Sequence, residues 1–181
     1  MKKIFAFILE ILQMVVLAAI VVLPIRYFIF QPFLVQGQCM EPNFENRDYL
    51  IVDEISFRFR EPKRGEVVVF RYPYNPSQRY IKRIIGLPGE TLEIKDNKVI
   101  IYSEGKAQVL DEKGYLSPDV LTAGELRIRL DENEYFVLGD NRGVAFDSRR
   151  WGLLPRKNII GRVIFRLWPI TALAKIEPPT Y

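Results

Sequence analysis

The sequence of 181 residues contains no histidine and a single cysteine. Without histidine, neither a Ser-His-Asp nor a Cys-His catalytic arrangement is possible. A zinc site would need carboxylates and one thiol, so we expect neither a metal nor another cofactor. One cysteine forms no internal disulfide and leaves the redox compartment open. Any nucleophile must use another base, and lysine is the main candidate because burial disfavours its charged form.

The chain also lacks a concentrated basic segment. Its net charge is +4, and lysines and arginines alternate with acidic residues along the sequence. This pattern predicts no nucleic-acid partner, whereas contact with an anionic lipid surface is reasonable. Because 49% of the residues are hydrophobic, we expect a folded domain and not a disordered chain.

A long apolar run lies at the N-terminus. Residues 4–25 are apolar except for Glu10 and Gln13, and a helix of this length spans roughly 33 Å, enough to cross a bilayer. Lys2 and Lys3 precede the run, so the positive-inside rule predicts a cytoplasmic N-terminus. We therefore expect a single-pass anchor in the cell membrane. A cleaved signal peptide and a buried core helix are the alternatives.

Beyond the apolar run, short β-rich segments alternate with turn residues. We predict a cytoplasmic tip and anchor in residues 1–30, and an all-β extracytoplasmic domain of short antiparallel strands in residues 31–181. A polar excursion from the sheet is expected at 103–125. Asp96 and Asn97 suit a tight hairpin turn. The candidate strands are 48–55, 65–72, 79–86, 91–94, 99–102, 126–130, 134–139 and 161–169.

Three segments contain candidate catalytic or binding residues. In "GQCMEP", Gly37 permits a tight turn, Pro42 fixes the chain after the thiol, and the Cys39 amide is free to face a substrate carbonyl. The alternative is that Cys39 is a small buried hydrophobic residue. In "RYIKRIIGLPGE", strand alternation sends Lys82 and Arg83 to opposite faces, so one of them points toward the apolar side.

The alternative for that second segment is an edge strand with both cations solvated. The third segment, "LGDNRGVAFDSRRWGLLP", follows a strand. It predicts a loop held by its own side-chain hydrogen bonds, with Asp147 and Arg149 as a charge pair. A purely structural turn is the alternative there.

Together the three segments resemble the type I signal peptidases, membrane-bound proteases with a Ser-Lys dyad that remove signal peptides from exported proteins. The similar motifs occur in order behind the apolar run: "GQCMEP", "YLIVDE", "RGEVVVF", "YIKRIIGLPGE", "GDNR" and "DSRRWG". The resemblance implies a mainly β catalytic domain whose substrates are preproteins with a small-x-small cleavage site. Lys82 matches the general base, and Cys39 falls on the nucleophile position.

On this resemblance the Cys39 backbone N–H contributes to the oxyanion hole, with Gly37 and Met40 beside it in the substrate-binding region. The residues that support the site are expected to be Pro42, Arg83, Gly139, Asp140, Asn141, Arg142, Asp147, Ser148 and Arg149.

Two positions depart from the family pattern. The family nucleophile is serine, which is replaced here by Cys39, and the serine that orients the lysine amine is replaced by Ala145. A thiol ionises more easily than a hydroxyl, so Cys39 and Lys82 are expected to work without the second hydroxyl. The alternatives are a homologue with little or no activity, which binds signal peptides or a membrane partner, and a variant of a serine enzyme.

Overall fold

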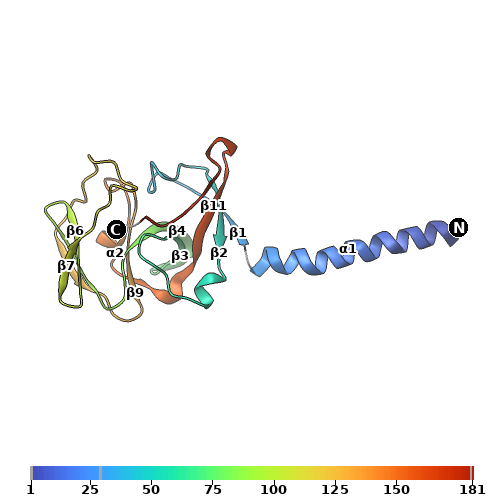
Figure 1. The fold of residues 1–181 in the computed structure, drawn as a ribbon, viewed down its shortest axis with the longest axis horizontal. Coiled ribbons are helices and arrows are strands. Elements are labelled where there is room, and N and C mark those ends of the chain that lie inside the picture. The colour runs from blue at the N-terminus through green and yellow to red at the C-terminus, as the bar shows by residue number, and fades with distance from the viewer. Residues whose placement is uncertain (1, 29, 180) are drawn as a thin grey trace.

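The computed structural model of the chain describes residues 2–28, 30–179 and 181. It consists of one long helix and a β-rich domain with two sheets (Figure 1). The helices and strands are α1 (Lys2–Phe28), β1 (Phe30–Leu34), β2 (Tyr49–Asp53), β3 (Val67–Tyr72), β4 (Asn75–Gly86), β5 (Thr91–Lys95), β6 (Lys98–Ser103), β7 (Lys106–Val109), β8 (Leu126–Arg129), β9 (Glu134–Leu138), α2 (Ser148–Trp151), β10 (Leu154–Pro155), β11 (Ile159–Trp168) and β12 (Ala174–Lys175).

The helix α1 extends away from the β-rich domain (Figure 1). It is 27 residues long, and between Phe7 and Ile20 its large apolar side chains are exposed, for example Leu17 at 66%. Among the residues that the structure describes, no helix combines the length and the apolar character needed to cross a membrane. The membrane span predicted at residues 4–25 therefore stays a prediction.

The larger sheet holds eight strands. Seven follow the order β1-β2-β11-β3-β4-β9-β10, β12 pairs with β11, and all of these pairings are antiparallel. Strand β4 carries apolar residues on both faces, because Ile81 packs in one core cluster and Ile84 in another. The central part of this sheet is thus covered on both sides, which matches the near-continuous apolar runs in its sequence.

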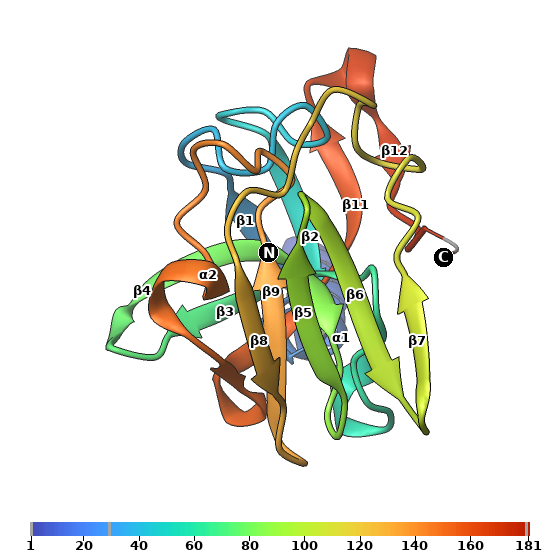
Figure 2. The same cartoon turned by 90° about the vertical axis from the view of Figure 1, so that its left-hand side faces the viewer.

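The smaller sheet has the order β7-β6-β5-β8 (Figure 2). Its hairpin between β5 and β6 turns at Asp96 and Asn97, both at positive φ (50° and 59°), as predicted. Leu92 and Ile94 of this sheet pack with Ile85 and Phe136 of the larger one in a shared core cluster. This cluster joins the two sheets.

The mainly β, antiparallel fold predicted from the sequence is confirmed, but four strands were not predicted. Strand β1 contains Pro32, which a strand tolerates at a sheet edge, where β1 lies. Strand β7 lies within the polar segment 103–125 and pairs with β6, so part of that segment belongs to the smaller sheet. Strands β10 and β12 are two residues long, too short to show a period.

Candidate functional site

The predicted nucleophile lies in a tight loop between β1 and β2. Gly37 has a φ of +90°, a conformation that side chains rarely adopt, and its N–H donates to Asn46 Oδ1 at 3.1 Å. Met40 is fully buried in a core cluster, which fixes the loop against the larger sheet. Cys39 is half-buried and Pro42 is exposed. The loop thus holds Cys39 at the surface of the core with its thiol accessible.

Cys39 and Lys82 meet at one backbone carbonyl. The Cys39 Sγ lies 3.8 Å from the Ile81 oxygen, and the Lys82 Nζ donates to the same oxygen at 2.9 Å. Lys82 is only 3% exposed, and its Nζ lies 5.7 Å from the centre of the Tyr80 ring. The structure therefore brings together the two residues that the sequence proposed as a pair, although they lie in separate elements.

Both cations of the "IKRI" segment are buried. Arg83 is 4% exposed, so the alternative of an edge strand with two solvated cations is wrong. The reason is that β4 is flanked by β3 and β9 at this point and is covered on both faces. Lys82 and Arg83 accordingly have different polar partners on opposite sides of the sheet.

The loop after β9 contacts the nucleophile loop, which is the segment between β1 and β2 that contains Cys39. The Asn141 backbone N–H donates to the Cys39 carbonyl at 3.1 Å, and the Asn141 Nδ2 donates to the Gln38 carbonyl at 3.1 Å. A Cβ on Gly139 would lie 2.5 Å from the Cys39 oxygen and 2.3 Å from the Ala145 Cβ. Only glycine fits at position 139, and the two loops pack directly on each other.

Through these contacts, the Gln38 and Cys39 carbonyls of the nucleophile loop accept hydrogen bonds from the loop after β9. Within the described part of the chain, the Cys39 N–H donates to no protein acceptor, and the Gly37 N–H is engaged by Asn46. The Cys39 amide is therefore a free donor beside its own thiol, the arrangement needed to stabilise an oxyanion.

A groove of 570 Å³ opens in front of the two residues. Segments from β1, from the nucleophile loop and from the first half of β4 line it. The lining residues are Pro32, Phe33, Leu34, Gln36, Cys39, Ser77, Gln78, Arg79, Tyr80, Ile81 and Lys82. Among the described strands, β9 pairs with β4 only from Arg83 onward, so the preceding residues have a free edge beside the groove. An extended chain fits such an edge by adding a strand.

Asp147 fixes the far end of the loop after β9. Its carboxylate accepts from the Gly139 N–H at 3.1 Å and from the Arg149 Nε at 2.9 Å, and it also caps α2. The Ser148 Oγ accepts from the Val137 N–H at 3.0 Å. The predicted Asp147–Arg149 charge pair is thus present, and it is mostly buried.

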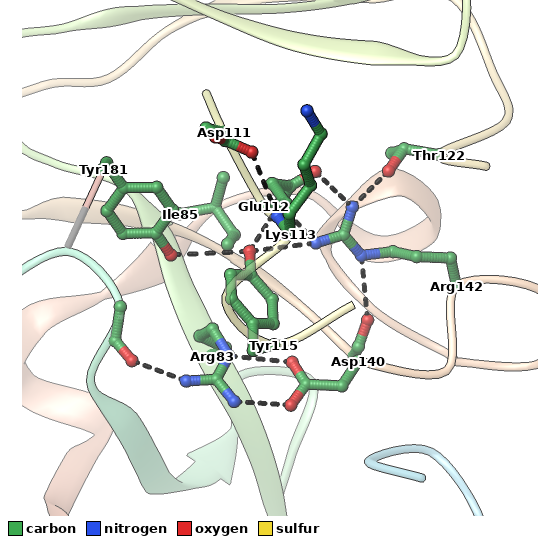
Figure 3. Close-up of polar contacts among 12 residues, drawn as sticks. Arg83, Ile85, Asp111, Glu112, Lys113, Tyr115, Thr122, Asp140, Arg142 and Tyr181 are labelled. Atoms are coloured by element: carbon green, nitrogen blue, oxygen red, sulfur yellow. Dashed lines mark hydrogen bonds and ion pairs between the residues drawn. The ribbon is translucent and has the colours of Figure 1, made fainter. Parts of the chain in front are cut away.

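Arg83 and Asp140 form a buried pair behind the site (Figure 3). The Arg83 Nε and Nη2 donate to the two Asp140 oxygens at 2.8 and 2.5 Å. Asn43 adds a hydrogen bond of 2.9 Å to the same carboxylate, and the guanidinium lies 4.2 Å from the centre of the Tyr115 ring. Burial opposes the charge of Arg83, but the Asp140 carboxylate outweighs it and raises the pKa of Arg83.

Arg142 connects the loop to the polar segment 103–125 (Figure 3). Its Nε donates to the Gly139 carbonyl at 3.1 Å, and its other nitrogens contact Glu112 and Thr122. Burial and the nearby Glu112 raise the pKa of Tyr115, which lies against the same guanidinium. The segment that the sequence suggested as an excursion therefore supplies partners to the site.

Four of these residues, Asn43, Glu112, Tyr115 and Thr122, were missed by sequence reasoning. Asn43 follows the "GQCMEP" motif directly, and the other three lie in the polar segment. Their contacts depend on how the two sheets pack, which no local pattern indicates. No cluster of possible metal ligands occurs within the described residues.

Comparisons with known proteins identify the family of the chain. A family model described as signal peptidase, peptidase S26, matches residues 8–168. The chain is 38% identical over 170 residues to a signal peptidase I of Leptolyngbya laminosa, covering 90% of this chain and 81% of the relative. It is 34% identical over 177 residues to signal peptidase I S of Bacillus subtilis, covering 93% of each.

Two further matches are also described as signal peptidase I proteins. Probable signal peptidase I-1 of Synechocystis is 34% identical over 182 residues, with 97% of this chain and 90% of the relative covered. A crystal structure of a signal peptidase I from Enterococcus faecalis is 31% identical and has a TM-score of 0.47, covering 57% of this chain and 97% of that one. By its family model and its relatives, this chain belongs to the type I signal peptidases of peptidase family S26, which are peptide-bond hydrolases.

Proposed function

We propose that this chain is a membrane-bound endopeptidase that removes signal peptides from exported preproteins, with Cys39 as nucleophile and Lys82 as general base. Membership of the signal peptidase family supports the reaction class. The observation that carries the assignment of residues is that the Cys39 thiol and the buried Lys82 amine contact the same Ile81 oxygen at the groove.

In this proposal, the Lys82 amine takes the proton of the Cys39 thiol as sulfur attacks the scissile carbonyl. The carbonyl π electrons move to oxygen, and the Cys39 N–H stabilises the resulting oxyanion. When the intermediate collapses, the C–N bond breaks and Lys82 returns the proton to the leaving amine. Lys82 then deprotonates a water molecule, which attacks the thioester. The C–S bond breaks, Lys82 returns the proton to the Cys39 sulfur, and the signal peptide leaves with a free carboxyl group.

The groove suggests how the substrate binds. A preprotein segment that adds to the free edge of β4 presents alternate side chains to the groove. Phe33, Leu34 and Ile81 give this part of the lining an apolar character. Together with the family resemblance, this supports a small-x-small sequence before the cut.

We further propose that α1 anchors the chain in the membrane as a single span, with the N-terminus in the cytoplasm and the β domain outside. The apolar run at residues 4–25, the preceding Lys2 and Lys3 and the exposed apolar side chains between Phe7 and Ile20 support this placement. The helix also extends away from the β-rich domain (Figure 1).

A second candidate function is capture of signal peptides without cleavage. One observation favours it: the Lys82 Nζ hydrogen-bonds the Ile81 carbonyl, and at position 145, where the family resemblance implies a serine that orients the amine, the chain has a buried alanine without a hydroxyl. In that case the groove binds the peptide and the thiol does not react.

One experiment separates the two functions. The full chain in detergent is incubated with a preprotein that carries a small-x-small site, in parallel with Cys39→Ala and Cys39→Ser. We expect the parent to cleave, Cys39→Ala to lose at least about a hundredfold in kcat/KM, and a thiol alkylator to inhibit the parent alone. Cleavage that survives Cys39→Ala contradicts the thiol nucleophile. Saturable binding of the uncleaved preprotein by the parent, with no cleavage, establishes the second function.

The contact between the two loops gives a further prediction. Gly139→Ala is expected to lower kcat/KM by about a hundredfold, because the added methyl group displaces Cys39 or Ala145, and a shift near 1 Å is enough for a loss of that size. Gly143→Ala in the same loop is the matched control, since its Cβ would meet nothing within 4 Å. Equal activity of the two variants would show that the loop absorbs the methyl group without moving the nucleophile.

A further inference from the structure

The charges along the groove have one sign. Of its lining residues, only Arg79 and Lys82 are charged, and no carboxylate lines it within the described residues. Lys82 is buried and engaged with the Ile81 carbonyl, whereas Arg79 is exposed. Arg79 is therefore the one groove cation that is free to contact the side chain of a bound peptide.

The surroundings of Arg79 leave this charge largely uncompensated. Its charge acts on the carboxylate of Glu54, the residue after β2, and the positive charges of Arg71 and Arg58 act on the same carboxylate. Burial raises the pKa of Glu54, while the three arginines oppose that rise. One carboxylate is shared among three exposed guanidinium groups, so it does not neutralise the charge of Arg79.

The register places Arg79 close to the reacting atoms. Arg79 is two residues before Ile81 on β4, so the two side chains lie on the same face of the strand. The Ile81 carbonyl is the group that Cys39 and Lys82 contact. A peptide paired with this edge of β4 therefore passes Arg79 within a few residues of the bond that Cys39 attacks.

We propose that Arg79 makes the site selective for substrates with an aspartate or glutamate within four residues of the cut, at a position other than the two small residues. This inference rests on the proposed function, because it names the substrate class of the same groove. An acidic side chain gains a charge-assisted contact with the guanidinium there, and a lysine at the same position is repelled.

The test uses the full chain in an uncharged detergent and preproteins that differ at one position. Glu, Gln or Lys is placed in turn at the middle residue of the small-x-small site, at the residue preceding that site, and at the first and second residues after the cut. At one position or more we expect kcat/KM to fall in the order Glu, Gln, Lys, with about tenfold between the ends at low salt. The ratio is expected to shrink in 0.5 M salt because exposed charges are screened.

Variants assign the effect to one side chain. Arg79→Gln should flatten the ratio and Arg79→Glu should invert it. Lys106→Glu makes the same charge change on an exposed residue of β7, in the smaller sheet and outside the groove lining, and it should leave the order intact. Equal processing of all charges by the parent, or an equal shift in Lys106→Glu and Arg79→Glu, overturns the proposal.

Two additional measurements keep this test independent of the proposed function. Dissociation constants of uncleavable peptides are measured in the same series, and they should show the same order even if the parent cleaves no substrate, an outcome that rejects only the peptidase. Binding to vesicles with and without anionic lipid is compared for the parent and Arg79→Glu. Loss of vesicle binding with an unchanged peptide order assigns the arginines to lipid phosphates and overturns the proposal.

Discussion

Lys82→Met is expected to reduce kcat/KM for preprotein cleavage by about a thousandfold, within the range that general acid and base groups contribute. Among the described residues, Lys82 is the only amine that lines the groove, and the guanidinium of Arg79 is too weak an acid to donate protons. Methionine keeps the length of the side chain without its amine. Because the hydrogen-bond partner of Lys82 is a backbone carbonyl, no buried charge is left unpaired, and the thermal midpoint should change little.

Two comparison variants test whether this loss comes from the missing amine of Lys82. Lys157→Met removes an exposed lysine from the same domain and should leave kcat/KM unchanged. Lys82→Arg keeps the positive charge but provides no usable base, so it should be as inactive as Lys82→Met. Substantial activity in Lys82→Arg would mean that the site needs only a cation beside the thiol, and would contradict proton transfer by Lys82.

The spacing of motifs made the main features of the site predictable. Cys39 and Lys82 lie 43 positions apart in sequence, and their proximity was inferred from the resemblance and from the absence of histidine. Asp147 and Arg149 were paired from local spacing, since side chains two residues apart beside a helix start reach each other. These inferences depend on short-range geometry or on a complete motif set, both of which are visible in the sequence.

Contacts that depend on packing between sheets were not predictable. Arg142 and Glu112 are partners because the segment after β7 folds back over the loop after β9, and neither segment shows a period that indicates this. The sequence pattern of β4 also did not predict that Lys82 and Arg83 are both buried. Alternation assigns two faces to a strand, but it does not tell whether both faces are covered. That β4 is covered on both faces follows only from the three-dimensional arrangement of the core clusters.

Arg83→Met is expected to lower the free energy of unfolding by about 3–5 kcal/mol, because it leaves the carboxylate of Asp140 buried without the guanidinium that pairs with it. Asp140 is 1% exposed and retains only the hydrogen bond from Asn43 in this variant. The measurement is denaturant unfolding of the full chain in detergent. Lys175→Met is the control: its pair with Glu177 also lies within hydrogen-bond distance, at 2.7 Å, but both side chains are more than 60% exposed, so the expected loss is below about 1 kcal/mol.

The double variant Arg83→Met with Asp140→Leu locates the origin of this cost. If the loss in Arg83→Met comes from the unpaired carboxylate, removing that carboxylate as well should recover most of the stability, since apolar pairs replace buried ion pairs at little cost. If it comes instead from the contact of the guanidinium with the Tyr115 ring and the Gly65 carbonyl, the double variant should stay as unstable as the single one. Arg83 follows Lys82 in the chain, and Asp140 lies in the loop after β9 that contacts Cys39. A recovered fold with low activity would therefore show that the ion pair positions these residues in addition to stabilising the domain.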